Sequence, residues 1–145
     1  MRVEIVEAPD FAPCAALRRR VFMDEQGFTE AEEFDALDAD AIHLLGLVDG
    51  VPMGTARLLR AGDVGKIGRV CVLPEARGTG LGARLIEASL ARLAKDPALS
   101  RAYLSAQTQA IGFYERAGFA AEGPEYLDGT VPHRDMWRAL RPGKG

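Results

Sequence analysis

The chain has 145 residues, which is about the length of one domain and enough to bury a hydrophobic core unaided. Apolar residues make up 48% and charged residues 27%, so the composition is that of a folded domain and excludes extensive disorder. The net charge of −3 argues against a nucleic-acid partner, and only two histidines and two cysteines, spread over the chain, argue against a His/Cys metal site. No segment resembles a membrane span or a signal-peptide core, so we expect a cytoplasmic protein.

Hydrophobic patterning predicts strands and helices in alternation. Alternating apolar residues, or apolar runs bounded by turn residues, indicate strands over 3–7, 41–48, 52–59, 66–73 and 102–106, one that starts at 119–121, and one over 133–140. Helical spacing indicates helices over 11–23, 80–94 and 108–116, and residues 28–40 form a loop or a short acidic helix.

These elements predict a mixed sheet. Asp-Gly at 49–50 indicates a hairpin, whereas the helix over 80–94 is a crossover, which normally joins parallel strands. We therefore expect an α/β fold in one domain over residues 1–140, followed by a tail at 141–145.

A glycine-rich stretch separates the strand over 66–73 from the helix over 80–94. It reads Arg77-Gly78-Thr79-Gly80-Leu81-Gly82-Ala83. A helix N-terminus offers unpaired N–H groups and partial positive charge, glycines admit close approach of a phosphate, and an arginine adds a cation. The stretch therefore predicts a phosphate-binding loop. It lacks the lysine of a nucleotide P-loop. It does satisfy the dinucleotide pattern GxGxxA, but the next strand does not end in the expected carboxylate, so a dinucleotide-binding oxidoreductase is the weaker alternative.

Two motifs resemble those of the GCN5-related N-acetyltransferase family. Residues 77–82 are similar to its pyrophosphate loop, Arg/Gln-x-x-Gly-x-Gly/Ala, and residues 107–119 resemble its A-x-x-F-Y-x-x-x-G-F element. Two further segments, V-F-x-x-E-Q-G at 21–27 and P-H-x-x-M at 132–136, resemble a subgroup of small bacterial, ElaA/YjcF-like acetyltransferases. The resemblance covers nearly the whole chain and implies the order β-α-βββ-α-β-α-ββ, with the fourth and fifth strands splayed apart.

The resemblance implies transfer of the acetyl group of acetyl-CoA directly to a primary amine of a small-molecule acceptor. On the family's pattern, acetyl-CoA would contact Val70, Cys71, Val72, Arg77, Gly78, Thr79, Gly80, Leu81, Gly82, Ala83, Gln107, Ile111 and Tyr114. The acceptor would contact Glu25, Gln26 and His133. From the composition and the lack of a long apolar run we expect no metal, no nucleic acid and no membrane partner. Homodimers are common among proteins that resemble this one.

The reaction needs an acid for the departing thiolate and a base for the amine. A tyrosine hydroxyl titrates near pH 10 and stays protonated at neutral pH, so Tyr114 is the candidate acid, with core packing as its alternative role. The strand over 66–73 carries no carboxylate, where many relatives place a base. Glu25 is therefore the candidate base or acceptor anchor, while another carboxylate, His133 or a water molecule stays open as the base. The alternative function is a non-catalytic acyl-CoA sensor.

The remaining polar and sulfur groups have ordinary interpretations. Cys14 and Cys71 lie in apolar runs and are expected to be buried free thiols that serve packing. His43 is expected in the core or on a strand surface. The acidic residues of the 28–40 segment, Asp35, Asp38 and Asp40, are expected to be solvated, or else to attract a cationic amine.

Overall fold

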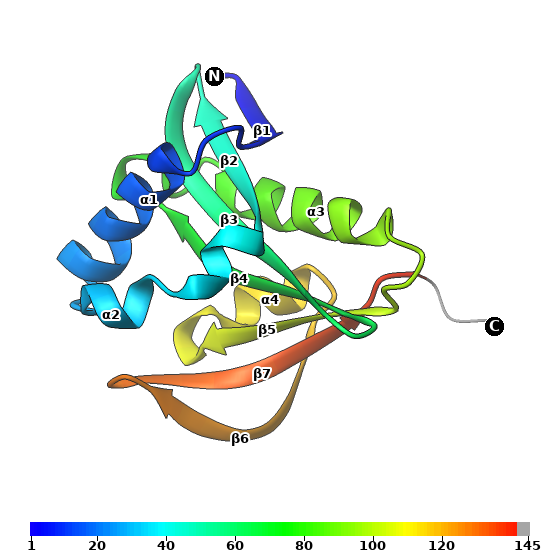
Figure 1. Cartoon of the computed structure of the whole chain (residues 1–145). Helices are drawn as coiled ribbons and strands as arrows, with labels where there is room; N and C mark the ends of the chain where they lie inside the picture. Colours follow the sequence, from blue (N-terminus) through cyan, green and yellow to red (C-terminus); the bar gives the residue numbers. More distant parts are fainter. Residues whose placement is uncertain (142–145) are drawn as a thin grey trace.

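A computed structural model describes residues 1–141 and has a seven-stranded mixed sheet with helices on both faces (Figure 1). The strands lie in the order β1-β2-β3-β4-β5-β7-β6. They span Val3–Glu7 (β1), Ile42–Val48 (β2), Val51–Ala61 (β3), Val64–Val72 (β4), Arg101–Gln107 (β5), Ala120–Asp128 (β6) and Val131–Ala139 (β7). This arrangement confirms the predicted α/β fold. The tail predicted at 141–145 lies, beyond Arg141, outside the described residues.

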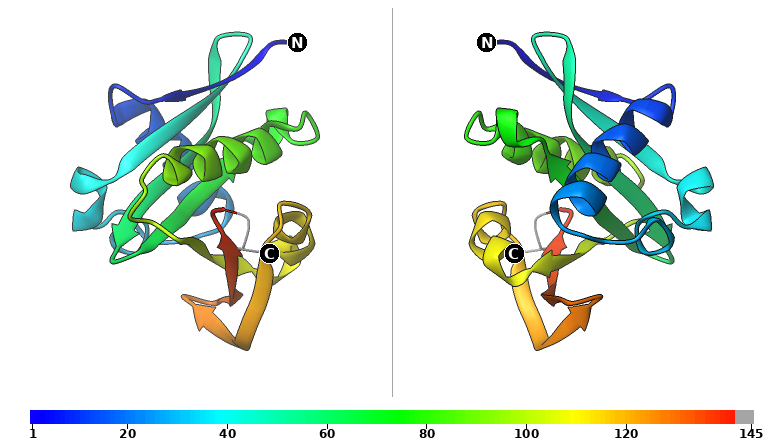
Figure 2. Two further views of the ribbon diagram at one scale, coloured as in Figure 1. Left: turned by 90° about the vertical axis from the view of Figure 1, so that its right-hand side faces the viewer. Right: turned by 90° about the vertical axis from the view of Figure 1, so that its left-hand side faces the viewer.

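The helices divide between the two faces of the sheet (Figures 1 and 2). One face is covered by α1 (Ala12–Arg18), its π-helical continuation (Arg19–Glu25) and α2 (Glu30–Glu33). The other face is covered by α3 (Leu81–Ala94), while α4 (Ile111–Arg116) packs on β5 and β6. Each face has its own buried apolar cluster, a larger one under α3 and a smaller one under α1. Within residues 1–141, none of the helices is long and apolar enough to span a bilayer.

The strands β4 and β5 pair as parallel neighbours only at their beginnings. Their register runs from Val64↔Arg101 to Lys66↔Tyr103 and then stops. Beyond this point β4 keeps its partner β3 and β5 keeps its partner β7, so the two strands diverge. Figure 2 shows the group β5, β7 and β6 turned away from β1–β4. The expected splay of the fourth and fifth strands is confirmed.

A β-bulge interrupts β4 in the diverging region. The register with β3 changes by one residue between the pairs Thr55↔Cys71 and Arg57↔Gly68, so β4 carries one extra residue there. Arg69 takes up this residue with a left-handed φ of 51°, a conformation that is uncommon outside glycine. Such strained positions concentrate at functional sites.

The bulge exchanges the two faces of β4. Ile67 packs in the cluster under α3, whereas Cys71, an even number of residues further on, packs in the cluster under α1. In an uninterrupted strand both would face the same way, because side chains alternate with a period of two. Simple alternation in the sequence therefore could not assign the faces of β4 correctly.

The first helix also departs from the regular geometry expected over 11–23. After Arg18 it widens into a π-helix, in which the amide of Gln26 donates to the carbonyl of Val21 at 3.0 Å. Gly27, with a φ of 82°, then ends it. The widened turn places Glu25 and Gln26 beside the gap between β4 and β5, where both contact residues that are distant in the sequence.

Candidate active site

The glycine loop between β4 and α3 presents free backbone donors. Among residues 1–141, no acceptor is found for the N–H groups of Gly78, Gly80, Gly82 and Ala83. Gly78 and Gly80 both have φ of 84°, and a methyl group built on either would meet no atom within 4 Å. The space beside both glycines is therefore open. A pyrophosphate fits it, because the donors lie at the positive end of the α3 dipole.

Neighbouring side chains hold the loop in shape. The Thr79 hydroxyl donates to the Ala76 carbonyl at 2.5 Å and accepts from the Leu81 amide at 3.3 Å. Leu81 is fully buried, and its side chain occupies the space left by Gly46 and Gly54. These contacts fix the start of α3 against the sheet, so the free amides keep their positions without a ligand.

Gly82 allows α3 and α4 to approach each other. A methyl group built on Gly82 would lie 3.3 Å from Cζ of Phe113. This contact brings the start of α4, where Ile111 packs against the core, close to the glycine loop.

Arg77 is paired with Glu25. Its Nη1 and Nη2 donate to the two carboxylate oxygens of Glu25 at 2.7 and 2.6 Å, and its Nε donates to the Val72 carbonyl at 3.1 Å. The hydrogen bonds and charge of Arg77 hold the pKa of Glu25 below its usual value. One N–H on each of Nη1 and Nη2 stays available to an anion in the loop. The carboxylate is a weaker base than a free glutamate.

A second contact joins the same turn to β5. The side-chain Nε2 of Gln107 donates to Oε1 of Gln26 at 2.8 Å, and the side-chain Nε2 of Gln109 donates to Oε1 of Gln107 at 2.6 Å. Gln107 is the last residue of β5. The turn at 25–26 thus spans the gap, with one contact to the glycine loop and one to the end of β5.

A cavity of about 380 Å³ opens at the gap between β4 and β5. Its walls come from the π-helix, α2, β3, β4, β5, α4 and the hairpin between β6 and β7. Its lining residues include Phe22, Gln26, Phe28, Glu32, Glu33, Leu37, Arg57, Leu59, Lys66, Ile67, Gly68, Arg69, Val70, Tyr103, Leu104, Ser105, Gln107, Ala110, Tyr114, Asp128 and His133. Of the acceptor residues expected from the resemblance, Gln26 and His133 line this cavity and Glu25 does not.

Tyr114 reaches the cavity from α4. Its ring packs edge-on against Phe113 and Phe119, with centroid distances of 5.0 and 6.2 Å. No hydrogen-bond partner for the Tyr114 hydroxyl is found in the part of the chain that the structure describes, and burial raises its pKa to about 12. The ring therefore serves packing, while the protonated hydroxyl remains available as a donor.

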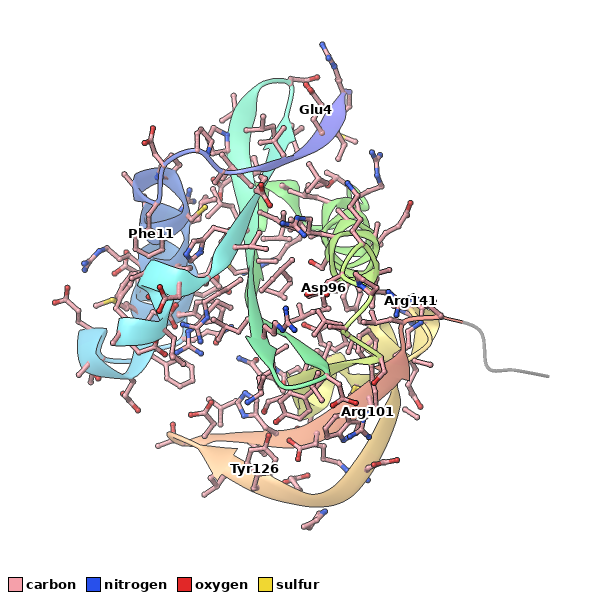
Figure 3. All side chains as sticks on the ribbon, turned by 45° about the vertical axis from the view of Figure 1, so that its right-hand side comes forward. Glu4, Phe11, Asp96, Arg101, Tyr126 and Arg141 are labelled. Carbon is pink, nitrogen blue, oxygen red and sulfur yellow. The ribbon has the colours of Figure 1, made fainter. Side chains whose placement is uncertain are left out.

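His133 lies on β7 opposite Gln107 of β5. It is 6% exposed and lines the cavity, and its Nδ1 lies 2.8 Å from the Val131 carbonyl oxygen. Its ring stacks on that of Tyr126, with centroids 6.3 Å apart. Figure 3 shows Tyr126 on β6, at the outer edge of the sheet.

A buried charge cluster, missed by sequence reasoning, supports the cavity from behind. Arg18 is completely buried, donates from Nε to Glu33 at 2.6 Å and donates from Nη1 to Asp38 at 2.7 Å. Arg57 also donates to Asp38, at 3.1 Å, and Nε of Arg69 lies 3.3 Å from Glu33. The cluster ties α1, α2 and the following 3₁₀ helix (Ala36–Asp40) to β3 and β4.

The acidic segment is therefore not the simple solvated surface that its composition suggested. Asp35 and Asp38 both pair with Arg57, whereas Asp40 is exposed. His43 is buried beside the cluster, with Nε2 2.9 Å from the Asp38 carbonyl oxygen. Arginines 15 to 36 residues away in the sequence supply the partners, so no local pattern could have revealed them.

The two thiols are packing groups, as their sequence context indicated. Cys14 is 0% and Cys71 5% exposed, and neither forms a disulfide. Burial raises the pKa of Cys71 to about 12, which leaves it protonated and unreactive.

Comparisons with known proteins agree with this geometry. The family model described as an acetyltransferase (GNAT) domain matches residues 8–140. A Bacillus subtilis protein whose name assigns it as an acetyltransferase is 38% identical over 133 residues, which cover 90% of each chain. An acyl-CoA N-acyltransferase structure from Pseudomonas aeruginosa is 32% identical, with a TM-score of 0.81 and coverage of 95% of this chain and 99% of the other. Escherichia coli ElaA is 28% identical, with a TM-score of 0.79 and coverage of 94% and 98%. With its splayed strands and open glycine loop, the chain belongs to the GCN5-related N-acetyltransferase family and has the acyl-CoA N-acyltransferase fold.

Proposed function

We propose that the protein transfers the acetyl group of acetyl-CoA directly to a primary amine of a small molecule. The observation that carries this proposal is the junction of two features at one place. The open glycine loop, with four unpaired N–H groups, is joined through the turn at 25–26 to a cavity that opens where β4 and β5 separate: Glu25 pairs with Arg77 of the loop, and Gln26 lines the cavity. A bound thioester supplies an activated acyl group there, and the chain has to hold it, orient it and admit an amine.

The cofactor would be held mainly by backbone. The amides of Gly78, Gly80, Gly82 and Ala83 are suited to the pyrophosphate, with Arg77 adding charge at the rim. Val70, Cys71 and Val72 lie on β4 beyond its last pair with β5, so their edge has no strand neighbour on that side. An extended pantetheine arm can pair with such an edge. Gln107 and Ile111 would contact the cofactor from the β5 and α4 side.

Tyr114 is the proposed general acid. The thiolate of the leaving cofactor has a conjugate acid with a pKa near 8.5, by analogy with cysteine, and needs a donor as the C–S bond breaks. The Tyr114 hydroxyl is protonated at every physiological pH because burial raises its pKa to about 12. Its proton has no competing acceptor among the described residues, which supports this role.

Glu25 is better suited to positioning than to proton abstraction. Both of its oxygens are occupied by Arg77, its pKa is lowered, and it does not line the cavity. We propose that Glu25 orients Arg77 at the cofactor loop. Gln26 and His133, which do line the cavity, form the acceptor side.

A thiol-release assay tests the proposal. Purified protein is mixed with acetyl-CoA and a panel of amines, amino sugars, polyamines and amino acids, and free CoA is measured. We expect amine-dependent release, and a fall of about 10²- to 10⁴-fold in Tyr114→Phe, the range for loss of a general acid. Tyr114→Phe keeps the ring packing, so its melting temperature is the folding control. CoA binding without release on any amine would instead indicate an acyl-CoA sensor.

A further inference from the structure

The structure leaves one step of the proposed reaction without a residue, the removal of the proton from the attacking amine. Glu25 is occupied by Arg77, and β4 carries no carboxylate. The missing base must face the cavity, must have a free lone pair and must not be held as an ion pair.

His133 meets these conditions because of its contact with Val131. A carbonyl oxygen can only accept, so the 2.8 Å contact to the Val131 carbonyl assigns the proton of the neutral imidazole to Nδ1. The lone pair then lies on Nε2. The backbone of its own strand thus fixes the tautomer and the orientation of the ring, as a carboxylate does in many histidine bases.

The Nε2 atom is accessible. No residue among the described 1–141 forms a hydrogen bond with it. Two side-chain polar atoms of the described residues are sealed from solvent and have no hydrogen-bond partner, Nδ1 of His43 and Nε of Arg57. Nε2 of His133 is not one of them, so it is not sealed from solvent. His133 is 6% exposed and lines the cavity.

The other ionisable groups of the cavity are already engaged or poorly placed. Glu33 is held by Arg18 and Arg69, and Oε1 of Glu32 accepts the Thr29 amide in the capping box of α2. Lys66 is a cation and cannot act as a base while charged. Asp128 is exposed in the last position of β6, at the tip of the hairpin.

We propose that His133 is the general base, an inference that rests on the proposed acetyl transfer. The amine nitrogen attacks the thioester carbonyl carbon, the C–N bond forms, and the ammonium proton passes to Nε2 of His133. The C–S bond then breaks, and the thiolate takes a proton from the Tyr114 hydroxyl. Proton exchange with solvent restores both side chains, and no further reactant is needed.

The ring of Tyr126 on β6 stacks on the imidazole, and Gln107 is its neighbour on β5. The titratable and charged side chains that line the same cavity are Glu32, Glu33, Arg57, Lys66, Arg69, Tyr103, Tyr114 and Asp128. Protonation of Nε2 removes the lone pair, so the rate of acetyl transfer falls as the pH is lowered. This decrease is the acidic limb of the pH–rate profile. Glu25 is a poor source of this limb, because the hydrogen bonds and charge of Arg77 hold its pKa below the usual glutamate value.

The test compares His133→Asn and His133→Gln with wild-type protein in single-turnover thiol release across pH. Asn keeps a donor near the Nδ1 position, and Gln keeps a polar group near Nε2, but neither is a base. We expect both to lower the rate about 10²- to 10⁴-fold, to abolish the acidic limb and to leave the Kd for CoA within about twofold. Imidazole in the buffer should restore part of the rate to His133→Ala.

Control variants separate the outcomes. Tyr126→Phe keeps the stacked ring and Glu25→Gln removes the other candidate base, so both should keep the acidic limb. An intact limb in folded His133→Asn would overturn the assignment while wild-type turnover still supports acetyl transfer. Absence of turnover in wild-type protein that binds CoA would overturn both. In the free protein, ¹⁵N NMR should show Nδ1 protonated in the neutral imidazole, and a proton on Nε2 would also overturn the assignment.

Discussion

The buried cluster around Arg18 gives a stability prediction that can be worked from its contacts. Arg18 is 0% exposed and donates to Glu33 and Asp38, with an additional bond from Nη2 to the Glu33 carbonyl at 2.9 Å. In Arg18→Met the aliphatic volume is largely kept, but two carboxylates lose a buried partner. Breaking a buried pair from one side costs about 3–5 kcal/mol, because the remaining charge is left uncompensated.

This cost corresponds to a large shift in melting temperature. For a chain of this size, each kcal/mol of lost unfolding free energy lowers the melting temperature by about 2–4 °C. We therefore expect Arg18→Met to melt roughly 6–20 °C below wild type in scanning calorimetry. The matched control is Arg19→Met, the next residue, whose pair with Glu30 is solvent-exposed and worth about 0–1 kcal/mol. A loss of less than about 1 kcal/mol in Arg18→Met, or equal losses in both variants, would refute the reasoning.

Three further predictions concern the same cluster and the two sides of the gap. Burial alone would raise the pKa of Asp38, but the hydrogen bonds and charges of Arg18 and then Arg57 outweigh it and lower that pKa. Asp38 therefore stabilises the fold above the unfolded carboxyl pKa of about 3.9, and this contribution is lost as pH falls through the lower folded value. In urea unfolding, the deficit of Asp38→Asn should be largest near pH 7 and should shrink toward pH 3; a deficit independent of pH contradicts this. Arg77→Ala should weaken CoA binding by about 1.5–3 kcal/mol in calorimetric titration, as for a hydrogen bond to a charged group, and unchanged affinity would remove Arg77 from the phosphate site. Gly68 lines the cavity and a methyl group built on it meets nothing within 4 Å, so Gly68→Val should raise the acceptor KM at least about tenfold, and Gly68→Ala less, without lowering the melting temperature. An unchanged KM in the valine variant would place the acceptor elsewhere.

The parts of the fold that the sequence predicts are those that depend on local patterns. The helix over 80–94 was predicted within one residue of α3, because its apolar spacing and its flanking glycines and proline lie within one segment. The parallel pairing of β4 and β5 followed from the same crossover. The glycine loop was also local, and its open conformation is what its glycines suggested.

The features that the sequence did not reveal depend on distant partners. Gly68 lies next to the bulged Arg69, and a glycine inside a strand can mark a bulge, but the apolar pattern over 66–73 was interpreted as a regular strand, so the reversed faces of Cys71 and its neighbours were not predicted. No local pattern indicated the buried ion pairs of Arg18 and Arg57, because their carboxylate partners lie 15 to 22 residues away. Glu25 was interpreted without its partner, since Arg77 is 52 residues distant.

The bulge and the splay together explain why both halves of the proposed reaction meet at one point. The glycine loop belongs to the α3 face of the sheet, whereas the cavity walls from the π-helix and α2 belong to the α1 face. A regular sheet would separate the two faces completely. Here β4 and β5 lose contact after Lys66, and two residues later the bulge begins, so the sheet opens where β4 also changes face. The turn at 25–26 then spans this opening through Arg77 on one side and Gln107 on the other. Two side-chain contacts therefore link the proposed cofactor loop to the wall of the proposed acceptor cavity.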